Sequence, residues 1–148
     1  MKVRIAIFAS GSGSNAQKLM EYFKRSPDAE ISLVLTNNSD AYVLQRADNF
    51  EIPSHIFDRN EFYNTDNVID LLKNLDIDLI VLAGFLWLIP KNLIAEYPGR
   101  IINIHPAILP KFGGGNIVTP SLNSGCLLEN SSLLPCVGFV ESCVHFSY

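Results

Sequence analysis

Three features are scarce in this 148-residue sequence: long apolar runs, cysteine and an excess of positive charge. No run approaches the roughly 18 apolar residues of a membrane-spanning helix, and the 11 basic residues are outnumbered by 15 acidic ones. We therefore expect neither a membrane protein nor a nucleic-acid binder. The chain enters an apolar run directly after Met1-Lys2, without the pattern of a signal peptide, so we expect a cytoplasmic location.

The few cysteines are also placed unevenly. Cys126, Cys136 and Cys143 all lie in the last 23 residues, and no two of them form a C-x-x-C pair. This odd number and spacing predict neither a zinc site nor a disulfide framework, so we expect no metal. The length suits one domain with its own core.

A strand, a glycine turn and a helix are indicated at the start of the chain. The run Val3 to Ala9, apolar except for Arg4, is followed at once by a Gly/Ser-rich turn, and helical spacing then covers Ala16 to Lys24. In this context, backbone N–H groups and the helix dipole hold a phosphate. The candidate phosphate-binding residues are Gly11, Ser12, Gly13, Ser14 and Asn15.

Two other interpretations of this turn stay open. The turn could cap the helix through a Ser or Asn side chain without binding a ligand. It departs from the dinucleotide fingerprint, yet Glu30 or Asp40 stands near the place, about 20 residues on, where a ribose-binding acid would be. A nicotinamide-dependent enzyme is therefore a minor alternative.

Apolar runs and helical spacings alternate along the rest of the first 115 residues. Strands are expected at 31–35, 54–57, 78–85 and 101–104, and helices at 42–50, 61–74 and 93–97. The alternation predicts an α/β fold with a doubly wound, Rossmann-like parallel sheet, in which the run at 78–85 is central. Ligands are expected at the carboxyl ends of the first, fourth and fifth strands.

The fifth strand carries two polar residues at its end. Asn103 and His105 alternate with Ile102 and Ile104, and Pro106 then stops the strand. Residues two apart on a strand share a face, so the amide and the imidazole are expected side by side. A pair of satisfied core residues would give the same pattern.

Three motifs together resemble a known family. They are GSGSN at 11–15, LAGF at 82–85 and NIHPAILPKFGG at 103–114, and the last is similar to the NIHPSLLP signature of folate-dependent formyltransferases. The resemblance covers about residues 2–115. It implies the formyltransferase fold and the transfer of a formyl group from 10-formyltetrahydrofolate to phosphoribosylglycinamide, a step of purine (IMP) biosynthesis.

The resemblance also implies roles for individual residues. The GSGSN turn would hold the substrate phosphate, with Gly13, Ser14 and Asn15 matching the family site most directly. Asn103 would stabilise the oxyanion and His105 would move protons. Folate would lie against Arg59, Asn103 and the apolar segment of Leu86, Trp87, Leu88 and Ile89. Trp87 stands where many relatives have an arginine, and the match at Arg59 is loose. Both implied partners are small molecules, and the oligomeric state is left open.

The composition changes after residue 115. Residues 116–148 contain no Lys or Arg and only two acidic residues, and no Asp follows Asp78. The resembled enzymes have in this region an aspartate that polarises the histidine. We therefore expect a formyltransferase-like domain at 1–115, incomplete at its C-terminus, and an atypical segment at 116–148. A shifted reading frame is favoured over divergence as its origin.

Several alternative functions follow from these departures. The chain could be an inactive truncated remnant or a non-catalytic module that binds a phosphorylated ligand. It could also be another folate-dependent formyltransferase or a formyltetrahydrofolate deformylase. The basic RNA-binding extension of the methionyl-tRNA enzyme and the extra N-terminal domain of the deformylase have no counterpart in this sequence.

Overall fold

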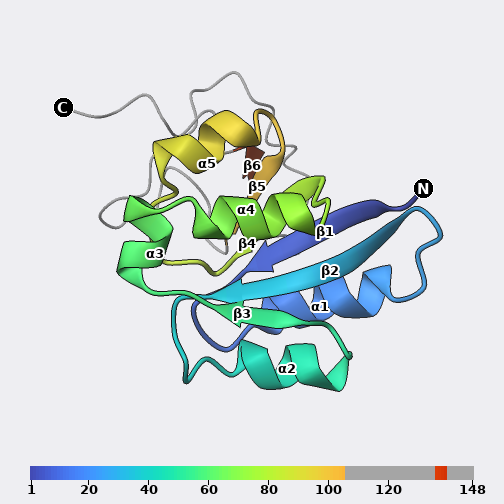
Figure 1. Ribbon diagram of the computed structural model, residues 1–148. Helices are drawn as coiled ribbons and strands as arrows, with labels where there is room; N and C mark the ends of the chain where they lie inside the picture. The colour runs from blue at the N-terminus through green and yellow to red at the C-terminus, as the bar shows by residue number, and fades with distance from the viewer. Residues whose placement is uncertain (106–135, 140–148) are drawn as a thin grey trace.

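The computed structural model describes residues 1–105 and 136–139, which form one sheet with helices on both faces (Figure 1). The strands are β1 (Val3–Phe8), β2 (Ala29–Thr36), β3 (Ser54–Ile56), β4 (Leu79–Ala83), β5 (Ile101–His105) and β6 (Cys136–Phe139). The helices are α1 (Ser14–Phe23), α2 (Val43–Asn49), α3 (Arg59–Asn64), α4 (Asn67–Asn74) and α5 (Lys91–Glu96). None of the described helices has the length and hydrophobicity needed to cross a membrane.

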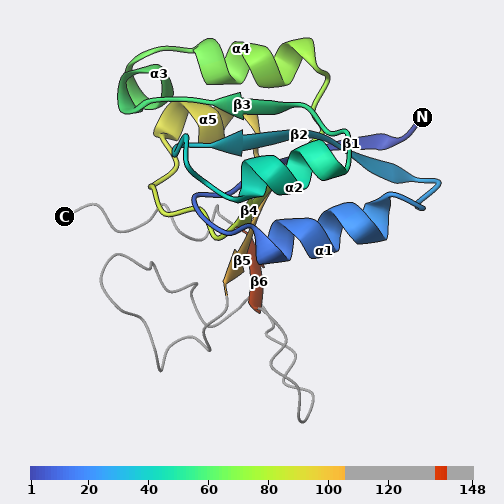
Figure 2. The same ribbon diagram turned by 90° about the horizontal axis from the view of Figure 1, so that it is seen from below.

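The strand order is β3-β2-β1-β4-β5-β6, and the first five strands are parallel. Helices α1 and α2 cover one face of the sheet, whereas α3, α4 and α5 cover the other (Figure 2). The predicted doubly wound α/β fold is confirmed, and β4 is central as expected. Chain order reverses direction between β1 and β4, which makes their carboxyl ends the switch point of the sheet.

One predicted helix is two helices in the structure. The spacing predicted a single helix over 61–74, but α3 ends at Asn64 and α4 begins at Asn67. Thr65 interrupts the helical path because its backbone is extended, with φ −132° and ψ 168°. The apolar spacing missed this break because Phe62 and Val68, one from each helix, are both buried against the same face of the sheet.

A sixth strand lies within the segment that was expected to be atypical. β6 pairs antiparallel with β5, with Asn103 opposite Gly138 and Ile104 opposite Val137. The edge of β5 is therefore covered, whereas sequence analysis counted only five strands. Residues 106–135 and 140–148 lie outside the described part of the chain, and the division at residue 115 stays a prediction.

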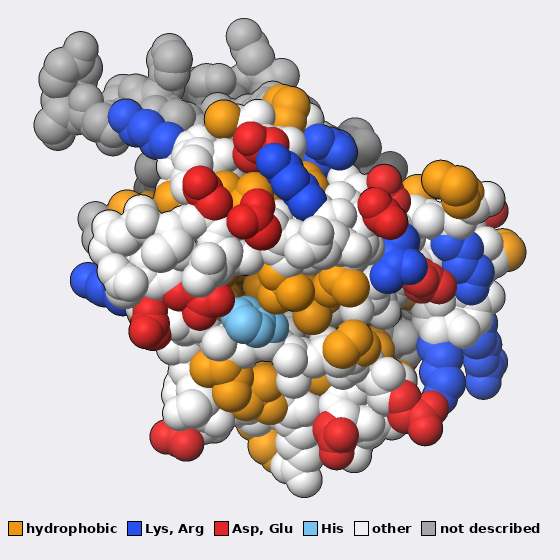
Figure 3. All heavy atoms as spheres, in the orientation of Figure 1, with side chains coloured by type: hydrophobic (Ala, Val, Ile, Leu, Met, Phe, Trp, Pro, Cys, Tyr) orange, Lys and Arg blue, Asp and Glu red, His pale blue; other side chains and the backbone are white. Residues whose placement is uncertain are grey.

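Charged side chains of both signs are mixed on the face of the molecule seen in Figure 3. Lys73 Nζ lies 2.7 Å from Glu96 Oε2, and Arg4 Nη1 lies 3.6 Å from Glu30 Oε1. All four of these side chains are more than a third exposed. Exposed pairs of this kind contribute about 1 kcal/mol or less each, so the core carries most of the stability.

An aromatic cluster forms the core beneath α3. Phe57 stacks on Phe62 with ring centroids 4.8 Å apart, and Phe8 from β1 lies 5.9 Å from Phe57. Phe8, Phe57 and Phe62 are at most 2% exposed. The half-buried Phe85 and Trp87 pack against them from the segment after β4. Packing of this cluster therefore sets the position of residues 85–87.

We expect Phe57→Ala to lower the free energy of unfolding by about 3–5 kcal/mol, because it leaves a cavity among close-packed rings. Tyr22→Ala is the matched control, since Tyr22 is 74% exposed and its loss should cost about 1 kcal/mol or less. Urea denaturation followed by circular dichroism measures both values. Equal losses for the two variants would contradict the position of the core.

Candidate active site

The carboxyl ends of β1, β4 and β5 are adjacent in the sheet. Phe8 of β1 is in register with Leu82 of β4, and Leu82 is in register with Asn103 of β5. The GSGSN turn (residues 11–15) follows β1, and Asn103 is on β5. The segment LAGFLWLI, residues 82–89, spans the end of β4. The predicted meeting of these three strand ends at one edge of the sheet is confirmed.

Gly13 gives the turn after β1 a shape that only glycine accommodates. Its φ is +69°, in the left-handed region, and it is the N-cap of α1. A Cβ at this position would lie 2.6 Å from the Cβ of Val43 on α2. The possibility that a Ser or Asn side chain caps α1 is not realised, because the N-cap is Gly13 and no side-chain cap bond occurs among the described residues.

The carbonyl groups of the turn are held by the protein. Val43 N donates to Gly11 O at 3.2 Å, and Gln17 N donates to Gly13 O at 2.8 Å. Between them, Arg46 Nε donates to Ser12 O at 2.7 Å. All three carbonyls therefore face α2 or the first turn of α1.

The N–H groups of the same turn face the other way. In a trans peptide the N–H of residue i+1 points opposite to the carbonyl of residue i. The N–H groups of Ser12, Gly13 and Ser14 therefore point away from the donors that hold Gly11, Ser12 and Gly13. Within the described chain, these N–H groups donate to no other residue. Free N–H groups at a helix N-terminus form an environment suited to an anion.

Ser10 joins the turn after β1 to the segment after β4. Its N–H donates to Gly84 O at 3.2 Å, and its Oγ accepts from Leu86 N at 3.0 Å. Ser10 is only 6% exposed, so its own donor and acceptor atoms lie inside the protein. The two loops at the switch point are thereby fixed relative to each other.

Arg59 and Trp87, both predicted from sequence, lie together. The Arg59 guanidinium lies 5.3 Å from the Trp87 ring centroid. Trp87 is half-buried and also packs against Tyr63, with nearly parallel rings 6.0 Å apart. Cation–π contact at an exposed site contributes about 0.5–1 kcal/mol. The Trp87 ring therefore belongs partly to the core and carries a cation on its outer part.

Tyr63 fixes the backbone of the same segment. Its hydroxyl donates to Leu88 O at 2.9 Å. Burial raises the pKa of Tyr63 above its ordinary value, and the nearby Arg59 charge opposes that rise. The hydroxyl is therefore protonated at neutral pH and serves as a donor. The bond anchors residue 88 to α3.

The remaining predicted residues differ in exposure. Leu86 is 82% and Leu88 is 63% exposed, whereas Ile89 and Asn103 are half-buried. Asn103 shares a register row with the buried Phe8 and Leu82, on the sheet face that α3, α4 and α5 cover. His105 ends β5, and its side chain lies outside what the structure describes.

Sequence analysis missed four residues that shape this edge: Ser10, Val43, Arg46 and Tyr63. Each acts through a backbone group of a distant segment, from 25 to 76 positions away. Such contacts leave no local pattern in the sequence. The nearest signal in the sequence is Ser10, a polar residue directly after the mostly apolar run at 3–9.

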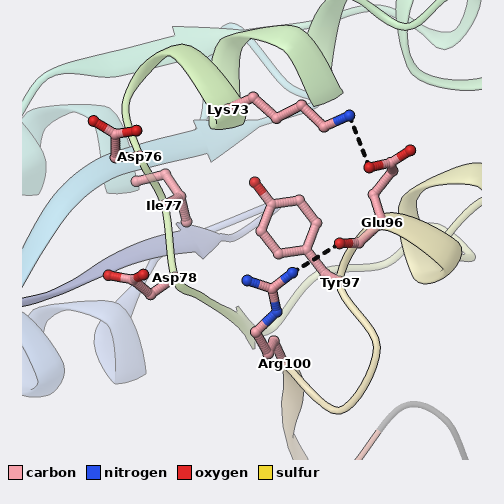
Figure 4. A pocket seen from close by; sticks show the side chains of 7 residues that line it. All are labelled: Lys73, Asp76, Ile77, Asp78, Glu96, Tyr97 and Arg100. Carbon is pink, nitrogen blue, oxygen red and sulfur yellow. Dashed lines mark hydrogen bonds and ion pairs between the residues drawn. The ribbon is translucent and has the colours of Figure 1, made fainter.

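Two surface hollows lie at the other end of the sheet. One, of about 300 Å³, is lined by charged residues around Tyr97, at the amino ends of β4 and β5 (Figure 4). Within it Lys73 pairs with the Glu96 carboxylate, and Arg100 donates to the backbone carbonyl of Glu96. The other, of about 420 Å³, involves residues at the amino ends of β1 and β2. No cluster of metal-ligating side chains occurs among the described residues.

Solved structures share this arrangement. Glycinamide ribonucleotide transformylase 1 from Geobacillus kaustophilus superposes with a TM-score of 0.70 at 36% identity, covering 78% of this chain and 64% of that one. Phosphoribosylglycinamide formyltransferase from Streptococcus pneumoniae gives 0.66 at 40% identity, covering 78% and 63%. The likeness extends to sequence as well as to fold.

Curated relatives agree with these structures. Phosphoribosylglycinamide formyltransferase of Haemophilus influenzae is 36% identical over 127 residues, which are 82% of this chain and 60% of the relative. The chain thus spans well under two thirds of that relative's length. The family model "Formyl transferase" matches residues 3–127, which extends past residue 115, where the resemblance was expected to end. Because this match covers most of the sequence, the chain belongs to the formyl transferase family.

Proposed function

We propose that this chain provides the substrate-binding edge of a phosphoribosylglycinamide formyltransferase, which moves a formyl group from 10-formyltetrahydrofolate to phosphoribosylglycinamide. One observation carries the proposal. The N–H groups of Ser12, Gly13 and Ser14, which donate to none of the described residues, lie at the same sheet edge as residues 82–89 and Asn103. The names of the relatives support this choice of reaction.

The phosphate of the substrate would bind to the turn after β1. The N–H groups of Ser12, Gly13 and Ser14, unused by the described part of the chain, would donate to it, and α1 adds the positive end of its dipole. Ser14 and Asn15 contribute side-chain donors at the same helix terminus. The binding residues would be Gly11, Ser12, Gly13, Ser14 and Asn15.

The formyl folate would lie along the segment after β4. Leu86 and Leu88 offer exposed apolar surface, and Ser10 and Tyr63 hold the backbone of that segment in place. Arg59 supplies a cation beside Trp87, suited to a carboxylate of the folate. Ile89 and Asn103 would complete the contact, and no metal is required.

The transfer itself needs one nucleophile and the movement of one proton from the attacking amine to the leaving folate nitrogen. The neutral amine of phosphoribosylglycinamide attacks the formyl carbon, so a C–N bond forms and the carbonyl oxygen becomes an oxyanion. Asn103 would donate a hydrogen bond to that oxygen. The bond from the formyl carbon to the folate nitrogen then breaks, and His105 would carry the amine proton to the leaving nitrogen.

A second candidate function is a binding module without turnover. It is favoured by one observation: residues 116–148, where the resembled enzymes carry an aspartate that polarises the histidine, contain no Asp. In either case we expect small-molecule partners, no nucleic acid or membrane partner, and a cytoplasmic location.

We expect Ser14→Ala/Asn15→Ala to weaken the affinity for phosphoribosylglycinamide about tenfold to a hundredfold, because hydrogen bonds to a charged group are lost. Titration calorimetry on the 148-residue chain measures this change. Asn49→Ala, at the exposed end of α2, is the control and should bind as the wild type does. Equal affinity in the double variant would contradict the phosphate site.

Turnover separates the enzyme from the binding module. We expect the 148-residue chain to turn over about 10⁴-fold slower than a chimaera in which the C-terminal segment of the Haemophilus influenzae relative follows residue 114, because losing an orienting acid costs about that factor. The absorbance change on release of tetrahydrofolate measures both rates. Equal rates would show that no such acid is needed.

In the same chimaera, we expect Asn103→Ala to lower kcat by about 10²–10³ with little change in KM. The reason is that the donor acts on a charge that exists only in the transition state. His105→Ala should abolish turnover. A change confined to KM would instead assign Asn103 to substrate binding.

A further inference from the structure

We propose that Arg46 is the positioning residue that orients the phosphate-binding turn, and that Tyr42 supports it in this task. This inference rests on the proposed function of the turn. It concerns how the turn acquires an anion-binding shape before any ligand is present. The carrying observation is the bond from Arg46 Nε to Ser12 O, at 2.7 Å, across 34 positions of sequence.

The bond from Arg46 fixes one particular peptide group. The Ser12 carbonyl and the Gly13 N–H belong to the same rigid plane, so holding the first sets the direction of the second. Without this bond the plane is free to rotate, because glycine at position 13 imposes little restriction on the turn. Rotation by half a turn would point the Ser12 carbonyl, not the Gly13 N–H, at a bound phosphate, which it would repel.

Of the three donors that hold the carbonyls of the turn, only Arg46 can be changed by substitution of a side chain. Val43 holds Gly11 O through its backbone N–H, and Gln17 holds Gly13 O through the first helical bond of α1. Neither bond depends on a side chain. Arg46 is the side-chain donor among the three, so its substitution changes the turn without removing a backbone bond.

The Tyr42 ring lies against the Arg46 guanidinium. The Arg46 Cζ lies 4.8 Å from the Tyr42 ring centroid, and Tyr42 is 52% exposed. A ring in this position limits the directions that the guanidinium adopts. The charge of Arg46 also remains near the turn, where it favours an anion.

The test uses the full chain with two probes, inorganic phosphate and phosphoribosylglycinamide. We expect Arg46→Met to weaken the binding of both about tenfold to a hundredfold in titration calorimetry, as for loss of one charge-assisted bond. Arg25→Met is the matched control, because it removes the same charge beyond the far end of α1. It should bind both probes as the wild type does.

A second variant and a ligand-free measurement keep the inference testable if Arg46→Met folds poorly. Tyr42→Leu keeps the donor and should weaken binding only severalfold. In the ligand-free protein, the amide NMR signal of Gly13 should shift in Arg46→Met and stay in place in Arg25→Met.

The outcomes separate this inference from the proposed function. Wild-type binding that Arg46→Met leaves unchanged overturns the role of Arg46 while the phosphate site stands. Equal weakening by Arg46→Met and Arg25→Met assigns the effect to net charge and also overturns it. If the wild type binds neither probe, the phosphate site fails, and the Gly13 signal alone then decides whether Arg46 orients the turn.

Discussion

The direction of the peptide groups between Gly11 and Ser14 is the constraint on which the proposed ligand-binding edge depends. Their carbonyls are turned toward α1 and α2 by three donors, and their N–H groups are thereby turned outward. Reversal of these planes would give the same loop a lining of carbonyl oxygens, which repel phosphate. The outward direction of these N–H groups, on which the proposed phosphate binding rests, is therefore a property of how α2 packs on the turn, and only partly of the turn's own residues.

The position of this edge also depends on the pairing of β1 with β4 as neighbours in the sheet. A right-handed crossover places β2 on one side of β1, and the chain returns to place β4 on the other side. The two loops that follow these strands then diverge toward opposite faces of the sheet, which opens the space between them. Ser10 spans this space at its base, so the two loops keep a fixed separation.

Much of this arrangement could be predicted from sequence, for reasons that are visible in particular residues. The alternation of apolar runs and helical spacing predicted the five parallel strands, because buried parallel strands are apolar on both faces. The break at Thr65 could not be predicted, since the buried Phe62 and Ile69, seven positions apart, keep a helical spacing across it. The residues of the turn were predicted, but Arg46 and Ser10 were not, because their partners are backbone atoms of distant segments.

Trp87 illustrates how stability and recognition share one segment. Its ring packs on Phe57 and Tyr63, so it extends the aromatic core to the loop after β4. Because the Trp87 side chain packs in the core, little of it is available to contact a ligand. The neighbouring Leu86 and Leu88 are exposed instead. The cation at this place comes from Arg59, held against the Trp87 ring. A folate bound here would therefore meet backbone groups, two leucines and a charge supplied by α3, and residue 87 would act by fixing where those groups lie.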